Sequence, residues 1–138
     1  KYSIDEITKY CSKYQIDYIA GIEARGFIIG APVAYQLGIG FLPIRKPEKL
    51  PSVVERVSYQ LEYGENILEM HKDAIDNGDK IMVIDDLLAT GGTTAAVFKL
   101  IERLGGKVIG ASFIIELEFL NPREKLEGYD IFSLVKYD

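Results

Sequence analysis

The sequence predicts an α/β fold in which a mainly parallel sheet carries helices on both faces. Short apolar runs, which suit buried parallel strands, alternate along the chain with segments whose apolar residues recur at helical spacing. This alternation is typical of parallel sheets joined by crossover helices. One segment differs: Val57–Tyr63 alternates apolar and polar residues, and a turn signal and a return strand over Ile67–His71 follow it, which predicts a β-ribbon projecting from the sheet.

The N-terminal segment predicts a helix followed by a buried strand. A capping box of the form S-x-x-E begins at Ser3, which is the expected N-cap. Cys11 lies on the apolar face of this helix, and we interpret it as a small buried hydrophobe rather than a reactive thiol. Tyr18–Ile22 is the first expected strand. A turn over Gly21–Gly26 leads into the next helix, which tolerates Pro32 if this residue lies in the first turn.

A short basic loop follows the second expected strand, Phe41–Ile44. The loop contains two prolines, which exclude regular structure, and three cations, Arg45, Lys46 and Lys49. A solvated loop is the ordinary interpretation of such a charge run. The position of the loop directly after a strand favours a site for an anion such as pyrophosphate.

The predicted ribbon has the position of an active-site lid. Val57–Tyr63 alternates strictly, Gly64–Asn66 is a turn signal, and Ile67–His71 is the expected return strand. A long excursion between two parallel strands is where a mobile lid is expected. Glu62 lies on the polar face, where a solvated glutamate is the ordinary interpretation. His71, the only histidine, is expected at the surface or an interface.

The stretch around which the chain is organised begins at Ile81–Ile84, an apolar run that predicts a buried strand. Asp85 and Asp86 follow it, then a turn of small residues, then a well-patterned helix with Thr90 as the expected N-cap. Gly105–Gly106 ends this helix. Further along, Val108–Ile115 and Ile131–Val135 are expected strands. Between them, Asn121–Pro122 is expected to cap a short helix that ends at Gly128.

The turn predicts an anion site because unpaired N–H groups and the positive end of a helix meet there. We expect Ala89–Thr93 to hold a phosphate, and a Gly92→Val change to crowd it and force an unfavourable backbone angle. Asp85 and Asp86 stand where open α/β sheets place ligands. Two acids beside a phosphate would repel it, so we expect them to accept hydrogen bonds from a ribose diol. No lysine lies in the turn, which excludes a Walker A loop, and no Rossmann fingerprint is present.

Composition narrows the class of protein. The 138 residues are 48% hydrophobic and 27% charged, which suits one globular domain with a real core. The net charge of −5 argues against general nucleic-acid binding. A single cysteine excludes an internal disulfide and a cysteine-cluster metal site. The absence of a long apolar run or a signal peptide predicts a cytoplasmic protein with no membrane partner.

The stretch from Asp85 to Thr93 resembles the phosphoribosyl pyrophosphate (PRPP) motif of the type I phosphoribosyltransferases, in the form carried by members that act on adenine. Other segments resemble the same family, lie in the family's order and span nearly the whole chain. They are Glu23–Phe27, Ile44–Lys46, Lys49–Pro51, Leu61–Gly64 and Phe132–Leu134. Several such motifs in one chain make the resemblance highly specific.

The resemblance implies a type I phosphoribosyltransferase fold in one domain over residues 1–138, with the ribbon as its lid. It also implies a purine-salvage reaction in which PRPP and adenine give AMP and pyrophosphate. Mg²⁺ would arrive with PRPP, and no protein ligand is assigned to it. A homodimer is expected. The family has an N-terminal segment that helps to cover the base, and we expect that segment to be absent from this chain because no counterpart is found.

Site residues follow from the matching motifs. Glu62 and Arg25 are the expected catalytic residues: Glu62 to exchange a proton with N7 of adenine, and Arg25 to stabilise the leaving pyrophosphate. Leu87 matches a residue that packs on the base. The expected substrate-binding residues are Asp85, Asp86, Leu87, Ala89, Thr90, Gly91, Gly92, Thr93, Arg25, Arg45, Lys46, Lys49 and Tyr63. The resemblance further implies a cis peptide between Glu23 and Ala24.

Two alternatives stay open from the sequence. One is a phosphoribosyltransferase for another purine base, such as xanthine or guanine, because the PRPP site hardly discriminates bases. The other is a regulator that binds PRPP without turnover. Such a regulator usually needs an added nucleic-acid-binding region, and the chain offers neither an extra domain nor a basic face.

Overall fold

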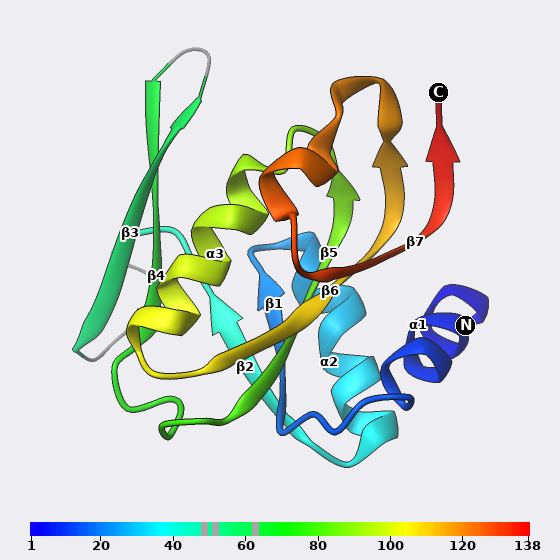
Figure 1. Ribbon diagram of the computed structural model, residues 1–138. Coiled ribbons are helices and arrows are strands. Elements are labelled where there is room, and N and C mark those ends of the chain that lie inside the picture. Colours follow the sequence, from blue (N-terminus) through cyan, green and yellow to red (C-terminus); the bar gives the residue numbers. More distant parts are fainter. Residues whose placement is uncertain (48–49, 51–52, 62–63) are drawn as a thin grey trace.

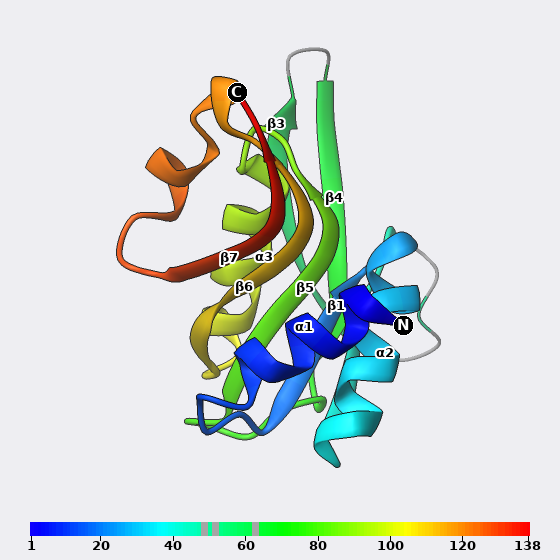
Figure 2. The same cartoon turned by 90° about the vertical axis from the view of Figure 1, so that its right-hand side faces the viewer.

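A computed structural model of the protein shows a five-stranded sheet between two layers of helices (Figures 1 and 2). It describes residues 1–47, 50, 53–61 and 64–138. The strand order is β2-β1-β5-β6-β7, and each of these pairings is parallel, which confirms the predicted fold class. The elements are α1 Tyr2–Cys11, β1 Tyr18–Ile22, α2 Arg25–Leu37, β2 Gly40–Ile44, β3 Val54–Leu61, β4 Gly64–His71, β5 Lys80–Leu88, α3 Gly92–Arg103, β6 Lys107–Leu117, the 3₁₀ helices η1 Glu118–Leu120 and η2 Pro122–Leu126, and β7 Asp130–Tyr137.

Strand β5 is buried on both faces because it separates two hydrophobic cores. Ile81 and Val83 point into the core beneath α3, whereas Met82 and Ile84 point into the core beneath α1 and α2. This position explains why the sequence there is continuously apolar rather than alternating. The carboxyl end of β5, which carries Asp85 and Asp86, is thereby fixed by packing on both sides.

Two predictions about helix geometry are wrong. Helix α1 begins at Tyr2 with Lys1 as N-cap and no side-chain cap, so Ser3 lies inside the helix and the capping box does not form. Pro32 lies in the interior of α2 rather than in its first turn. A proline there removes the hydrogen bond to the Ile28 carbonyl, but Ile28 is 74% exposed, so water can reach this side of the helix. The interpretation of Cys11 as a buried hydrophobe is confirmed.

The β3–β4 ribbon is confirmed as an antiparallel pair outside the main sheet, and it lies along α3 (Figure 1). Its register pairs Leu61 with Gly64, so Gly64–Asn66 starts strand β4 and is not the predicted turn. Val57 packs into the core from β3. A backbone bridge between Arg45 and Glu69 joins the ribbon to the end of β2.

The C-terminal third is close to expectation, with one correction. Strands β6 and β7 extend beyond the predicted ranges and pair in parallel. The short helix predicted to follow Asn121 is the 3₁₀ helix η2. Asn121 is its N-cap residue, with φ of 49°, but the Asn121 side chain does not cap the helix. Within the described part of the chain, no helix has the length and apolar character needed to span a bilayer.

Candidate functional site

A pocket of about 210 Å³ opens at the carboxyl ends of β1 and β5, which are neighbours in the sheet. The parallel register aligns Gly21 with Ile84, so the turn after β1 meets the acids at the end of β5. Open α/β sheets place ligands at this edge. The pocket is lined by Arg25, Asp85, Asp86, Leu87, Leu88, Ala89, Thr90, Gly91, Thr93 and Thr94.

The turn at the bottom of this pocket is fixed by Gly91. Gly91 is the N-cap of α3 and has φ of 77°, and no side chain caps the helix. The prediction of Thr90 as N-cap is therefore wrong by one residue. A Cβ on Gly91 would stand 2.5 Å from the Pro122 carbonyl oxygen, so both conformation and space require glycine there. The uncapped helix start places backbone donors and the positive end of the dipole at the pocket.

Gly92 does not have the backbone strain that the sequence predicted. Its backbone has no positive φ, and an added Cβ would make only an ordinary contact with Thr90 at 3.6 Å. Gly92 does not line the pocket; it lines a hollow on the other side of the turn, next to the ribbon. The expected backbone strain at Gly92 is wrong, and Gly91 is the residue that carries it.

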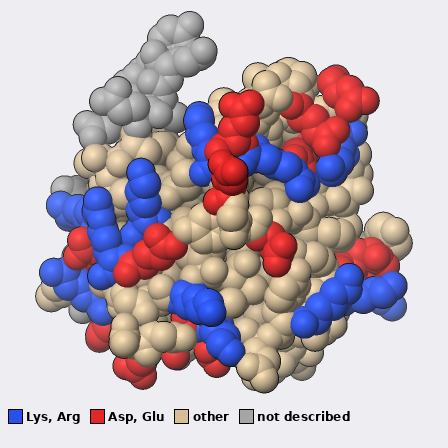
Figure 3. Space-filling view, in the orientation of Figure 1, with Lys and Arg blue, Asp and Glu red and all other residues tan. Residues whose placement is uncertain are grey.

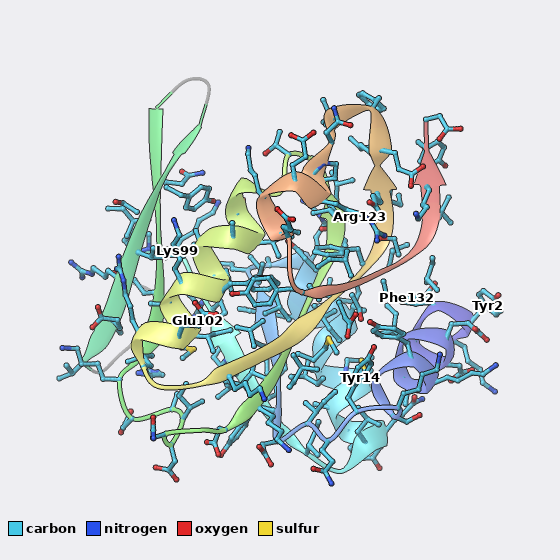
Figure 4. The ribbon with its side chains drawn as sticks, in the orientation of Figure 1. Tyr2, Tyr14, Lys99, Glu102, Arg123 and Phe132 are labelled. Carbon is cyan, nitrogen blue, oxygen red and sulfur yellow. The ribbon has the colours of Figure 1, made fainter. Side chains whose placement is uncertain are left out.

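The turn is supported from behind by η2. Arg123, labelled in Figure 4, comes from η2 and donates to both carboxylate oxygens of Glu116 in β6, at 2.6 and 2.8 Å. Glu116 is only 1% exposed. The hydrogen bonds to Arg123 keep the pKa of the Glu116 carboxyl below its usual value. This bidentate pair holds η2, and with it the Pro122 carbonyl that packs against Gly91.

The first acid, Asp85, is packed against the start of α2. A Cβ on Gly26 would stand 3.2 Å from Asp85 Oδ1, so the small residue makes room for the carboxylate. Asp85 Oδ1 also accepts a hydrogen bond from the backbone N–H of Asp86 at 2.9 Å. Burial raises the pKa of the Asp85 carboxyl to about 7, and this N–H hydrogen bond and the charge on Arg25 oppose the rise.

The second acid, Asp86, pairs with Arg25. Arg25 Nε donates to Asp86 Oδ2 at 2.5 Å, and this bond raises the pKa of the arginine. The Arg25 side chain is 72% exposed. A guanidinium has five N–H donors in a planar fork, so one bond to Asp86 leaves capacity for an anionic ligand. The peptide between Glu23 and Ala24, just before Arg25, is cis, as the resemblance implied.

Arg45 and Lys46 lie at the next strand end, organised by Glu23. Because Ile22 pairs with Ile44 in parallel register, Glu23 and Arg45 leave the sheet side by side. Arg45 Nε donates to Glu23 Oε1 at 2.9 Å, and the Lys46 N–H donates to Glu23 Oε2 at 3.4 Å. The Arg45 guanidinium also lies over the Phe27 ring. Glu23 was not among the predicted site residues, although its place opposite Arg45 follows once β1 and β2 are paired.

The predicted site residues thus fall into three groups. The pocket brings together Arg25, Asp85, Asp86, Leu87, Ala89, Thr90, Gly91 and Thr93. Arg45, Lys46 and Gly92 are neighbours of this group but do not line the pocket. Lys49, Glu62 and Tyr63 lie outside the described residues. Among the residues that are described, no group of three histidine, cysteine or acidic side chains is arranged to hold a metal ion.

Comparisons with known proteins agree on one family. Residues 3–132 match the model of the phosphoribosyl transferase domain. The chain is 54% identical over its full length to the adenine phosphoribosyltransferase of Clostridium kluyveri and covers 80% of that protein.

Solved structures of similar proteins have the same fold. A crystal structure of adenine phosphoribosyltransferase from Thermoanaerobacter pseudethanolicus matches with a TM-score of 0.96 and 53% identity, over 99% of this chain and 79% of that one. The Saccharomyces cerevisiae enzyme, in complex with an imino-altritol bisphosphate and adenine, matches with a TM-score of 0.88 and 39% identity, over 95% and 76%. The family resemblance stated from the motifs is confirmed, and the chain belongs to the phosphoribosyltransferase family.

Proposed function

We propose that the protein transfers the 5-phosphoribosyl group from PRPP to adenine, giving AMP and pyrophosphate in purine salvage. One observation carries the proposal: paired acids at a strand end open directly onto an uncapped helix start, inside one pocket. A phosphate site beside a pair of acids that can bind a diol matches the two polar parts of ribose 5-phosphate. The 54% identity to the C. kluyveri enzyme supports adenine as the base.

In this proposal the 5′-phosphate binds at Ala89–Thr93, and Asp85 and Asp86 accept hydrogen bonds from the ribose hydroxyls. Arg25 stands beside the acids with donors to spare, which suits the pyrophosphate on C1 of the sugar. Arg45 and Lys46 supply further positive charge at the neighbouring strand end, and the family motif assigns Lys49 to the same task. Leu87, 36% exposed at the edge of the pocket, offers an apolar surface to the base.

The chemistry that this arrangement supports is substitution at C1 of the ribose. As pyrophosphate departs, positive charge develops on the sugar, and the carboxylates beneath it favour that charge. N9 of adenine attacks C1, and Glu62 accepts the proton from N7. The ribbon, with Tyr63, excludes water that would otherwise capture the cationic sugar.

A Mg²⁺ ion bound to PRPP fits this pocket better than a resident metal would. The carboxylate oxygens of Asp85 and Asp86 suit a hydrated cation held mainly by phosphate oxygens, which is how Mg²⁺ usually binds. When bound, the metal neutralises charge on the leaving pyrophosphate. Homodimeric assembly stays a prediction from the family resemblance, and a cytoplasmic location stays a prediction from the amino-acid sequence.

The test is PRPP-dependent conversion of a panel of purine bases, in which the release of pyrophosphate is measured. We expect adenine to be converted to AMP and the other bases to react poorly. Preferred conversion of guanine or xanthine would overturn the base assignment. Binding of PRPP with no conversion of any base would favour a regulator instead.

The surface charge does not support a regulator that binds nucleic acid. The face in Figure 3 carries interspersed acidic and basic side chains, whereas a nucleic-acid-binding face would be expected to be continuously basic.

A further inference from the structure

A hydrogen bond joins the phosphate turn to the ribbon. Thr93 Oγ1 donates to the hydroxyl of Tyr59 at 3.2 Å. Thr93 lies in the first turn of α3 and lines the pocket, whereas Tyr59 belongs to strand β3. Tyr59 lies in the predicted lid but is not among the predicted site residues, so the proposed mechanism gives it no role.

The surroundings of Tyr59 leave its hydroxyl free to reverse this bond. Asn66, its cross-strand partner on β4, donates to the Tyr59 oxygen at 3.4 Å. The Tyr59 oxygen can therefore accept from Asn66 while its own proton is donated to Thr93 Oγ1. The Thr93 proton is then available to a phosphate oxygen in the pocket. Hydrogen bonds in such a chain polarise one another, which strengthens the terminal donor.

The ribbon does not depend on this bond for its place. The Tyr59 ring packs against the core beneath α3, and Val57 is buried in the same core. At the other end of α3, Arg103 donates to the Arg56 carbonyl at 3.2 Å. Lys99, on the side of α3 that faces the ribbon (Figure 4), lines the same hollow as Tyr59. Removing only the Tyr59 hydroxyl should therefore leave the ribbon packed.

We propose that Tyr59 is a positioning residue for the 5′-phosphate, acting by orienting the Thr93 hydroxyl, and that it couples occupancy of the turn to the ribbon. The inference rests on the proposed function, because it takes the turn as the phosphate site. It predicts an effect on ligands that carry a 5′-phosphate and none on free pyrophosphate, which has no phosphate in the turn.

The experiment measures the dissociation constants of ribose 5-phosphate and of pyrophosphate for the wild type and Tyr59→Phe by calorimetry. We expect ribose 5-phosphate to bind about three- to tenfold more weakly to Tyr59→Phe, the effect of one net hydrogen bond, with pyrophosphate binding unchanged. In a Thr93→Val background, adding Tyr59→Phe should cause no further loss, because the group through which Tyr59 acts is gone.

Tyr129→Phe is the matched control. Tyr129 also packs its ring against the core beneath α3 and donates its hydroxyl to Glu102, outside the pocket. Loss of the Tyr129 hydroxyl should change neither the dissociation constant of ribose 5-phosphate nor that of pyrophosphate. Normal ribose 5-phosphate affinity in Tyr59→Phe, an equal loss for pyrophosphate, or an undiminished loss in the Thr93→Val background would each overturn the inference. If the wild type converts adenine and Tyr59→Phe binds ribose 5-phosphate with normal affinity, only the inference about Tyr59 is overturned. If the wild type does not bind ribose 5-phosphate, the proposed phosphate site is overturned together with the inference.

Discussion

The two ends of the proposed site are built from different kinds of structure. The phosphate and ribose end consists of strand β5, the Gly91 turn and helix α3, whose backbone is fixed by two hydrophobic cores and by the Pro122 carbonyl. Besides Arg25 and Leu87, the pyrophosphate and base end consists of a loop after β2 and of the ribbon. Its positions depend on individual contacts, such as the ion pair of Arg45 with Glu23 and the backbone bridge between Arg45 and Glu69.

This difference separates two tasks. The rigid end can recognise groups that stay unchanged in the reaction, because backbone donors fixed in place lose no freedom on binding. In the proposed mechanism the other end carries the groups that meet the reacting atoms, and the ribbon, which lies outside the main sheet, is the lid that opens and closes over them. Changes to the backbone of the rigid end should therefore affect stability and binding. A change at Glu62, which is proposed to meet the reacting atoms, should affect turnover.

The largest effect is expected from Glu62→Gln in the ribbon. Glutamine keeps the shape and hydrogen-bonding capacity of the side chain but cannot exchange the N7 proton. We expect turnover to fall by about 10²–10⁴, the usual contribution of a general acid–base group, while PRPP affinity stays close to normal. Steady-state kinetics beside a PRPP titration provide the measurement.

Glu55→Gln is the control for this change. Glu55 is also a glutamate of the ribbon, but it pairs with Lys72 at the end of the strand pair remote from Leu61. A surface pair of this kind is worth little, so its loss should leave turnover unchanged. Near-normal turnover in Glu62→Gln would remove Glu62 from the mechanism. A matching loss of PRPP affinity would instead assign it to ribbon placement.

The second-largest effect is expected at the rigid end, where two adjacent glycines can be compared. Gly91→Ala places a Cβ at φ of 77° and against the Pro122 carbonyl, so we expect it to lower the free energy of unfolding by about 1–3 kcal/mol and to weaken ribose 5-phosphate binding. Gly92→Ala meets only an ordinary contact at 3.6 Å and should be close to neutral in stability. Urea denaturation of both variants is the test. Equal destabilisation by the two changes would contradict the assignment of the turn to Gly91.

The difference between these two glycines also shows which features of the site could not be predicted from the sequence. The strand at Tyr18–Ile22 and the acid pair could be predicted because hydrophobic period and contiguous motifs are local signals. Gly91 and Gly92 are locally equivalent. What separates them is the Pro122 carbonyl, brought to the turn by η2 and held there by the Arg123–Glu116 pair. That constraint is tertiary and has no local signal.

Of two other misses, the one at Ser3 has a local cause and the one at Glu23 has a tertiary cause. The capping box at Ser3 has the right residues, but the first turn already closes when the Asp5 N–H bonds to the Lys1 carbonyl, so the helix starts earlier. Glu23 acquires its role only when β1 and β2 pair and bring it beside Arg45. Family resemblance supplied the residues of the site, whereas their supports came from contacts between distant segments.

The smallest effect is a proton released when a ribose ligand binds at the rigid end. Asp85 has a pKa raised to about 7, mainly by burial, so near pH 7 it is about half protonated. Because this folded-state pKa lies above the usual value of 3.8, ionisation of Asp85 costs stability as pH rises from about 4 to 7. Ribose hydroxyls that donate to Asp85 stabilise its charged form, so binding should lower the pKa and release about half a proton at pH 7.

Calorimetry of AMP binding in buffers of different ionisation enthalpy measures this proton directly. The 5′-phosphate of AMP titrates near pH 6 and also loses a proton at a positive helix end, so the wild type alone cannot assign the release. Asp85→Asn keeps the shape of the side chain and removes its titration. Its proton release should fall to the phosphate contribution, and the difference from wild type should decline towards zero above about pH 8, where Asp85 is already ionised. Identical release from both proteins would show that the ribose does not bind to Asp85, and of the two acids only Asp86 would then be left to accept hydrogen bonds from the ribose.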